Sequence, residues 1–283
     1  MDDDITAGPL LPSVEAATGH ALASGALGPI DTREEVVHER GYAFRLRTVA
    51  GLARKEAAQA QAKAGSFDRD PFLPPYEEGL HVGPVRPAHV GLLNKFPVLE
   101  NHLLVVTDRF RPQEGALDRA DCEALVRILG AGAGLAFYNS GEPAGASQPH
   151  RHLQWVPLAE RPALEAAVAA GHALPFPVAS EPLPPAWIDE PAAGAPALHR
   201  CYARLLAAIG CTRDAQHPDA PSPYNLLATR DRVWAVPRTH GSIDGVAINA
   251  LGYAGWMLAA DDTQAETVRT RGPLSLLAAA AGR

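Results

Sequence analysis

The chain has 283 residues, of which 47% are hydrophobic and 20% are charged, and its formal net charge is −7. This length can bury a full core, as one large domain or two interlocked ones, and the composition is ordinary for a soluble globular enzyme. The acidic balance argues against a general nucleic-acid-binding protein, although a local basic pocket can still form.

The N-terminus and the cysteines indicate the cytoplasm. The opening stretch MDDDITAGPLLPS is acidic and lacks the basic and apolar regions of a signal peptide. No apolar run approaches the roughly 20 residues that span a bilayer. The three cysteines, Cys122, Cys201 and Cys211, show neither zinc-type spacing nor an even-numbered disulfide framework. We therefore expect a cytoplasmic protein that binds no membrane.

The first part of the chain alternates short helices and strands. Residues 13–27 predict a helix, YAFRLR (42–47) alternates as a strand does, and residues 51–65 have a helical composition. The proline-rich stretch DRDPFLPPYEEG is a loop. Two apolar, β-branched runs, HVGLLNKFPV and HLLVVTDRF, flank a short LEN turn and predict an antiparallel hairpin.

The middle of the chain continues this pattern. LDRADCEALVRILGAGAG predicts a helix with Asp118 or Asp121 as its N-cap. LAFYNSG then predicts a strand, EPAGASQP a loop and HRHLQWVPL the next strand. Residues 158–198 are rich in alanine and proline, which marks them as a boundary or an insertion.

The last part predicts a helix over ALHRCYARLLAAIG, two strands in YNLLATRDRVWAVPRTH, strand-like sequence near DGVAIN and a terminal helix from about 262. Strand pairs joined by tight turns and interspersed with helices favour an α+β antiparallel sheet over a doubly wound fold. We expect a catalytic N-terminal part over 1–165. A C-terminal part over 190–283 completes the sheet and the substrate pocket, and both form one integrated unit.

The stretch SQPHRHLQWVPL places His150, His152 and Gln154 at every second position. In a strand these three side chains share one face, while Arg151, Leu153 and Trp155 share the other. A polar face of this kind has three interpretations. It can bind zinc, although a third ligand is missing and glutamine is a poor one. It can be packed or solvated without chemistry. It can also carry a nucleophilic imidazole that attacks phosphorus.

The preceding loop favours the nucleophile. GASQP is small and polar, so backbone N–H groups, the Ser147 hydroxyl and the Gln148 amide can approach an anion. Asn139 ends the preceding strand and can lie on the same rim. Gln154 can donate its amide N–H to a phosphate oxygen. Such neutral donors beside an imidazole suit a polyphosphate better than a metal ion.

Three blocks of sequence, in order, resemble a known family. LLNKFPVLENHLLVVT, AFYNSGEPAGASQPHRHLQWVPL and YNLLATRDRVWAVPR are similar to the diadenosine tetraphosphate phosphorylases, also called ATP adenylyltransferases, of the histidine-triad-like superfamily. The match runs from about residue 40 to 260. It implies an α+β histidine-triad-like fold, with a central antiparallel sheet and flanking helices. It also implies phosphorolysis of diadenosine tetraphosphate to ATP and ADP.

The resemblance implies roles for individual residues. His152 is similar to the nucleophile that forms a nucleotidyl-histidine intermediate, and His150 to its supporting partner. Gln154 matches the phosphate contact that replaces the third histidine of histidine-triad hydrolases. Implied substrate contacts are Asn94, Lys95, Asn139, Gly145, Ala146, Ser147, Gln148, Thr229, Arg230, Asp231, Arg238 and His240, the last at a position where the family pattern predicts a basic residue. Lys55 lies near a family lysine and is included with them.

The implied mechanism needs positive charge around the substrate. His152 attacks an α-phosphorus and ATP leaves; phosphate then attacks the adenylyl-histidine and gives ADP. Only three of the 25 basic residues are lysines, so Lys55 and Lys95 are candidates, with Arg238, for holding a tetraphosphate. We expect small-molecule substrates, no nucleic acid and no tightly bound cofactor. A divalent cation such as Mg²⁺ would arrive with the substrate's phosphates.

Three other functions stay open at this point. A histidine-triad-like nucleotide hydrolase would use water in the second step. A hexose-1-phosphate nucleotidyltransferase shares the H-x-H-x-Q pattern and the double displacement. A non-catalytic nucleotide-binding protein would bind adenine nucleotides without forming a covalent adduct.

Overall fold

The computed structural model describes residues 3–28, 30–49, 69–212 and 221–282. The helix expected over 51–65, and Lys55 within it, lie outside the described residues. None of the helices within these ranges is long and apolar enough to cross a membrane.

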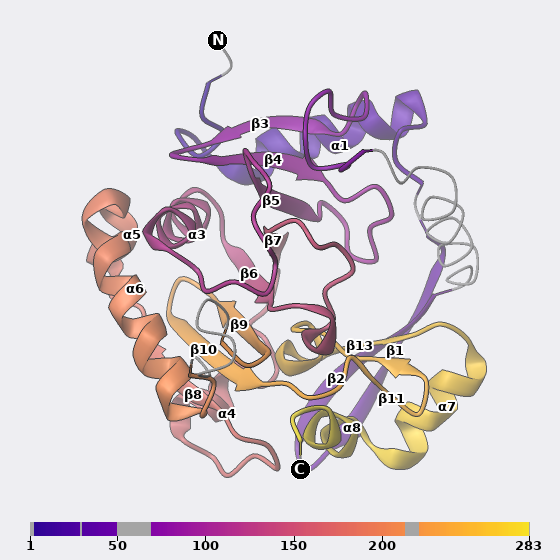
Figure 1. Ribbon diagram of the computed structural model, residues 1–283. Coiled ribbons are helices and arrows are strands. Elements are labelled where there is room, and N and C mark those ends of the chain that lie inside the picture. The colour runs from indigo at the N-terminus through magenta and orange to yellow at the C-terminus, as the bar shows by residue number, and fades with distance from the viewer. Residues whose placement is uncertain (1–2, 29, 50–68, 213–220, 283) are drawn as a thin grey trace.

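A large antiparallel sheet organises the molecule (Figure 1). Its eight strands run in the order β3-β4-β5-β7-β6-β9-β10-β8, and every neighbouring pair is antiparallel. Their bounds are β3 (His81–Val85), β4 (His89–Leu93), β5 (Leu103–Thr107), β6 (Gly134–Asn139), β7 (His152–Pro157), β8 (Ala179–Pro182), β9 (Tyr224–Ala228) and β10 (Arg232–Pro237). The expected α+β antiparallel sheet is confirmed, as is the hairpin around LEN, which is β4–β5. Strands from both the 1–165 and the 190–283 parts belong to this sheet.

A smaller sheet was only partly foreseen. It contains β1 (Thr32–Glu39), β2 (Tyr42–Val49) and β13 (Trp256–Ala259), with β13 parallel to β2. Of these three strands the sequence predicts only β2, because β1 is mostly charged and β13 is a short apolar run without alternation. The strand-like DGVAIN region forms a minor hairpin of β11 (Ser242–Ile243) and β12 (Val246–Ala247).

Helices cover both faces of the large sheet. One face packs against α1 (Leu10–Ser24), α3 (Arg119–Ala131), α5 (Pro185–Asp189) and α6 (Pro191–Ala208), in a core that includes Leu153 and Trp155. The other face packs through residues such as Phe137 and Val156 against the smaller sheet, α7 (Asp262–Arg271) and α8 (Pro273–Ala280). The short α4 (Glu165–Ala170) lies beside β8 and β10.

Helix boundaries follow the local sequence. Asp118 is the N-cap of α3, and its side chain accepts from the backbone N–H groups of Ala120 and Asp121. Asp121, the third residue of the helix, completes the capping box because its side chain accepts from the backbone N–H of Asp118. The expected terminal helix is two helices instead of one, because Pro273 has no N–H to donate and begins α8 after Gly272.

Candidate active site

His152 begins β7, the fourth strand of the large sheet, and is 4% exposed. It lies beside Val106 of β5, on the face opposite to Leu153 and Trp155. The pairing of Phe137 with Gln154 puts Asn139 level with His152, and Asn225 of β9 pairs in turn with Asn139. The catalytic candidate and two polar residues therefore form one row across three strands.

One ring nitrogen of His152 already makes a hydrogen bond within the protein. Its Nδ1 lies 2.8 Å from the carbonyl oxygen of His150. A carbonyl only accepts, so Nδ1 carries the hydrogen and Nε2 carries the lone pair. Burial, the largest cause, lowers the pKa of His152 to about 4, although the hydrogen bond to the His150 carbonyl raises it; the nearby His150 ring lowers it further. The imidazole is thus neutral at physiological pH, which is the state a nucleophile needs.

We expect the low pKa of His152 to be visible in its reactivity toward a substrate phosphorus. With a pKa of about 4, the ring is still about 97% neutral at pH 5.5, whereas an unperturbed histidine would be about 9% neutral. The single-turnover rate of attack should therefore stay near its plateau at pH 5.5 and fall only as the pH approaches 4. Rapid-quench measurements between pH 4.5 and 8 test this, and a roughly tenfold fall at pH 5.5 would contradict it.

His150 is held from both ends of its ring. Its Nδ1 lies 2.6 Å from Asp70 Oδ2, and its Nε2 lies 2.9 Å from both the hydroxyl and the carbonyl oxygen of Thr107. Phe72 meets the rings of His150 and His152 edge-on, at centroid distances of 5.7 and 5.3 Å. The two imidazoles therefore lie on the same side of the chain, as the alternation predicted. Fixing the His150 ring also fixes the carbonyl that holds His152.

Gln154 is oriented by a relay of two residues. The amide nitrogen of Asn94 lies 3.1 Å from Nδ1 of His102, and Nε2 of His102 lies 3.0 Å from Oε1 of Gln154. Because an amide nitrogen only donates, His102 carries its hydrogen on Nε2 and donates it to Gln154. Within the described residues no hydrogen bond is made by the amide nitrogen of Gln154. Asn94 thus supports Gln154 in this structure, one step away from the direct substrate contact expected for it.

The loop between β6 and β7 lies at the His152 end of the sheet. It contains the short 3-10 helix η1 (Glu142–Ala144), after which Gly145 adopts a φ of 91°. A Cβ on Gly145 would meet Ile248 O at 2.7 Å, so only glycine fits against this neighbouring loop. The side chain of Ser147 is exposed and Ala146 and Gln148 are half-buried. Among the described residues, the backbone N–H groups of Ser147 and Gln148 have no hydrogen-bond acceptor, which leaves them available to an anion.

Asn139 and Arg238 belong to a buried network. Oδ1 of Asn139 accepts from the Asn225 amide at 2.8 Å and from the backbone of Ala250 at 3.0 Å. Arg238, 2% exposed, donates to Asn225 Oδ1 and to the carbonyl oxygens of Ala144, His240, Ile248 and Ala280. These five acceptors use all five guanidinium donors. The expected phosphate contact of Arg238 is therefore replaced by a structural role, in which it ties together the loops around the site.

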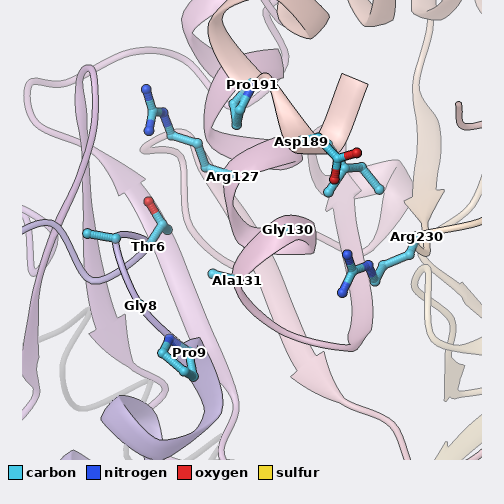
Figure 2. A pocket seen from close by; sticks show the side chains of 11 residues that line it. Thr6, Gly8, Pro9, Arg127, Gly130, Ala131, Asp189, Pro191 and Arg230 are labelled. Carbon is cyan, nitrogen blue, oxygen red and sulfur yellow. The ribbon is translucent and has the colours of Figure 1, made fainter. Parts of the chain in front are cut away.

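The expected contacts at Thr229, Arg230 and Asp231 are not at the site. They form the β9–β10 turn, and the antiparallel register places this turn at the opposite end of β9 from Asn225, about 13 Å along the strand. Thr229 donates to the buried Glu165, and Asp231 pairs with Arg161. Arg230 lines a separate cavity of about 510 Å³ on the helical face, which Arg127 and Asp189 also line (Figure 2).

Lys95 and His240 lie at the margins of the site. Lys95 is in the β4–β5 turn, beyond the Gln154 end of β7, where it pairs with Glu77. His240 is exposed, accepts or donates a hydrogen bond with Thr239, and follows β10 at the same end of the sheet as His152. Among the described residues there is no group of three or more histidine, cysteine or carboxylate side chains arranged around a metal ion.

Several residues of the site were missed by the sequence analysis. Asp70 lies in the proline-rich loop, where nothing in the pattern distinguishes it. His102 is the first residue of the HLLVVTDRF run, which predicts a strand but gives no sign of a functional histidine. Asn225 was treated as part of a strand, and Gln113 follows a proline in an apparently featureless connection. Each of them reaches the site only through the tertiary fold.

Comparisons with known proteins show which family the chain resembles. Residues 2–171 match the family model described as Ap4A phosphorylase N-terminal domain, and residues 172–282 match that of the ATP adenylyltransferase C-terminal domain. Diadenosine 5',5'''-P1,P4-tetraphosphate phosphorylase 2 of Saccharomyces cerevisiae is 28% identical over 251 residues, or 74% of either chain. Protein APA1 of the same yeast is 29% identical over 232 residues, covering 68% of this chain and 69% of the relative.

Solved structures show the same fold. The crystal structure of yeast Ap4A phosphorylase Apa2 superimposes with a TM-score of 0.77 at 25% identity, covering 98% of this chain and 94% of that chain. The structure of Apa2 in complex with Ap4A also gives 0.77, at 23% identity, covering 98% and 97%.

Proposed function

Since the chain belongs to the Ap4A phosphorylase family, whose members phosphorolyse diadenosine tetraphosphate (Ap4A) to ATP and ADP, we propose that His152 carries this reaction. The observation that supports this assignment is that Nδ1 of His152 already donates a hydrogen bond within the protein. Its hydrogen bond to His150 O leaves the lone pair of a neutral, buried ring on Nε2.

The chemistry consists of two displacements at one phosphorus atom. In the first, the Nε2 lone pair of His152 attacks the α-phosphorus of Ap4A, the bond to the bridging oxygen breaks, and ATP leaves with that electron pair. In the second, an oxygen of inorganic phosphate attacks the same phosphorus. The P–N bond then breaks, ADP leaves, and Nε2 recovers its lone pair. Neither step requires a proton from the enzyme.

The surrounding donors suit the charges on this path. The free amide N–H₂ of Gln154 would bind a non-bridging oxygen of the adenylyl phosphate, since its carbonyl is held by His102. The free N–H groups of Ser147 and Gln148 would bind the departing triphosphate. A divalent cation such as Mg²⁺ would accompany the substrate's phosphates. A cytoplasmic location is consistent with the three free, buried cysteines.

Trapping the covalent intermediate tests this function directly. Incubation of the enzyme with Ap4A in phosphate-free buffer, followed by denaturation and mass spectrometry, should show one adenylyl group on the peptide that contains His152. Addition of phosphate before denaturation should remove the adduct and release ADP. Binding of Ap4A without any adduct would instead identify a non-catalytic nucleotide-binding protein. Discharge of the adduct to AMP in plain buffer as fast as phosphate discharges it to ADP would identify a hydrolase.

Replacement of Lys95 by methionine tests the role of this lysine in substrate binding. If its ammonium contacts a phosphate, KM for Ap4A should rise about tenfold in Lys95→Met, which is the size expected for a lost charged hydrogen bond. Thermal stability should hardly change, because the pair with Glu77 is exposed, with 42% and 49% of the two side chains accessible. Glu77→Gln is the matched control: it removes the same ion pair but keeps the ammonium, and its KM should not rise. Equal KM values for Ap4A in both variants would show that Lys95 does not contact the substrate.

A further inference from the structure

The strand pairing around His152 is interrupted by a side chain. β6 and β7 pair regularly from Gly134↔Pro157 to Phe137↔Gln154, and continuing this register by two residues would pair Asn139 with His152. At that position the backbone N–H of His152 donates to Oε1 of Gln113, at 2.8 Å. Nε2 of Gln113 donates to the carbonyl oxygens of Asn139, at 2.8 Å, and of His152, at 3.3 Å.

The amide of Gln113 therefore replaces direct pairing between the two strands. Its oxygen accepts from one strand and its nitrogen donates to both, as a peptide group of an intervening strand would do. Paired residues that bond directly have Cα atoms about 5.5 Å apart; an interposed amide holds them further apart. The sheet thus opens at His152, the proposed nucleophile, and at Asn139 beside it.

Gln113 is itself held firmly. The residue is fully buried, its backbone N–H donates to Pro149 O at 2.8 Å, and its carbonyl accepts from the hydroxyl of Tyr138. One residue before it, Pro112 forms an isolated bridge with His150. Because the backbone and the side chain are both anchored, the amide can impose a fixed position on the backbone of His152.

We propose that Gln113 is a positioning residue for the nucleophile. Its amide fixes the backbone of His152 and keeps β6 and β7 apart at the site, so that Nε2 lies in line with the α-phosphorus. This inference rests on the proposed function. It adds a residue of the 108–118 connection, far from the H-x-H-x-Q motif in sequence, to the groups on which the adenylylation rate depends.

Two substitutions of Gln113 test the proposal. Gln113→Leu removes all three hydrogen bonds while keeping a similar volume. A displacement of about 1 Å at a reacting group costs about 10²-fold in rate, so single-turnover adenylylation should slow by about this factor with KM almost unchanged. Tyr202→Phe is the control. It removes the two buried hydrogen bonds that the Tyr202 hydroxyl makes, with the Leu117 N–H of the same connection and with the Tyr224 hydroxyl, and neither of them involves His152. Its adenylylation rate should stay within twofold of the wild type.

The second substitution, Gln113→Glu, restores the amide's hydrogen-bond pattern only when it is protonated. A neutral carboxyl group can accept from the His152 N–H and donate to Asn139 O, whereas a carboxylate has no donor and faces two carbonyl oxygens. The rate of Gln113→Glu relative to wild type should be near one at pH 5 and fall about 10²-fold as the pH rises to 8. A ratio that stays within twofold of one over this range would overturn the proposal, even if Gln113→Leu does not fold.

A readout that is independent of catalysis separates this inference from the proposed function. In wild type the His152 amide is protected by Gln113, so its hydrogen exchange, followed by NMR, should be at least tenfold faster in Gln113→Leu, which has no acceptor at this position, than in Tyr202→Phe. If wild-type enzyme forms no adenylyl adduct but the exchange difference is present, the proposed function fails and the amide bridge stands. Exchange of the His152 amide in folded Gln113→Leu as slow as in Tyr202→Phe would refute the bridge itself.

Discussion

His152→Ala should lose phosphorolysis of Ap4A almost completely while keeping its fold. Removal of a covalent nucleophile costs on the order of 10⁴-fold or more, because both displacements pass through the same nitrogen atom. The neighbouring donors, Gln154 and the backbone of Ser147 and Gln148, would remain, so binding of Ap4A should persist. The measurements are steady-state turnover of ATP and ADP, Ap4A binding by calorimetry, and circular dichroism to verify folding.

The matched control for this variant is His20→Ala, which removes an exposed histidine of α1 far from the site. Its turnover should equal that of the wild type. His152→Ala should also form no adenylyl adduct, so that loss of turnover and loss of the adduct occur together. A folded His152→Ala enzyme with turnover within tenfold of the wild type would exclude His152 as the nucleophile. An adduct on another residue would have the same consequence.

Omission of phosphate should stop the enzyme after one adenylylation. Water attacking an adenylyl-histidine benefits from a base that removes its proton, whereas phosphate arrives already anionic. The family resemblance implies that Gln154 takes the place of the third histidine of histidine-triad hydrolases, and an amide cannot exchange a proton at neutral pH. Its carbonyl is moreover occupied by the hydrogen from His102, so it has only N–H groups to offer to a phosphate oxygen. Without phosphate we therefore expect a burst of about one ATP per enzyme, followed by slow release of AMP.

The burst experiment distinguishes a transferase from a hydrolase by its products. With phosphate present, ATP and ADP should form in equal amounts over many turnovers. Rescue by added phosphate after the burst should release ADP at once, which controls for enzyme inactivation. Continuous AMP formation in phosphate-free buffer, at the rate seen with phosphate, would mean that water is the natural acceptor.

Structural features that depend on residues close together in the sequence could be predicted from the sequence. Side chains alternate in every strand, so His152 and Gln154 had to share a face wherever β7 lay in the fold. The β4–β5 hairpin and the Asp118 capping box likewise depend on residues a few positions apart. The resemblance of three ordered blocks then indicated the reaction, because the family's chemistry is concentrated in one short motif.

Residues brought in from distant segments were not predictable. Asp70 is 80 residues from His150, His102 is 52 from Gln154, and Gln113 is 39 from His152. No local pattern links such pairs, since their contacts exist only after the sheet has formed.

The C-terminal assignments show why sequence position alone could mislead. Thr229 and Asn225 belong to the same short stretch, yet the antiparallel register puts Asn225 beside Asn139 and Thr229 at the far end of the sheet. The basic side chain of Arg238 was expected to contact a phosphate. In the folded protein it is buried, and all five of its guanidinium N–H groups donate to protein oxygens. Local periodicity decides which face a side chain occupies. Strand register and packing decide which end of the strand reaches the substrate, and which polar groups remain free to bind it.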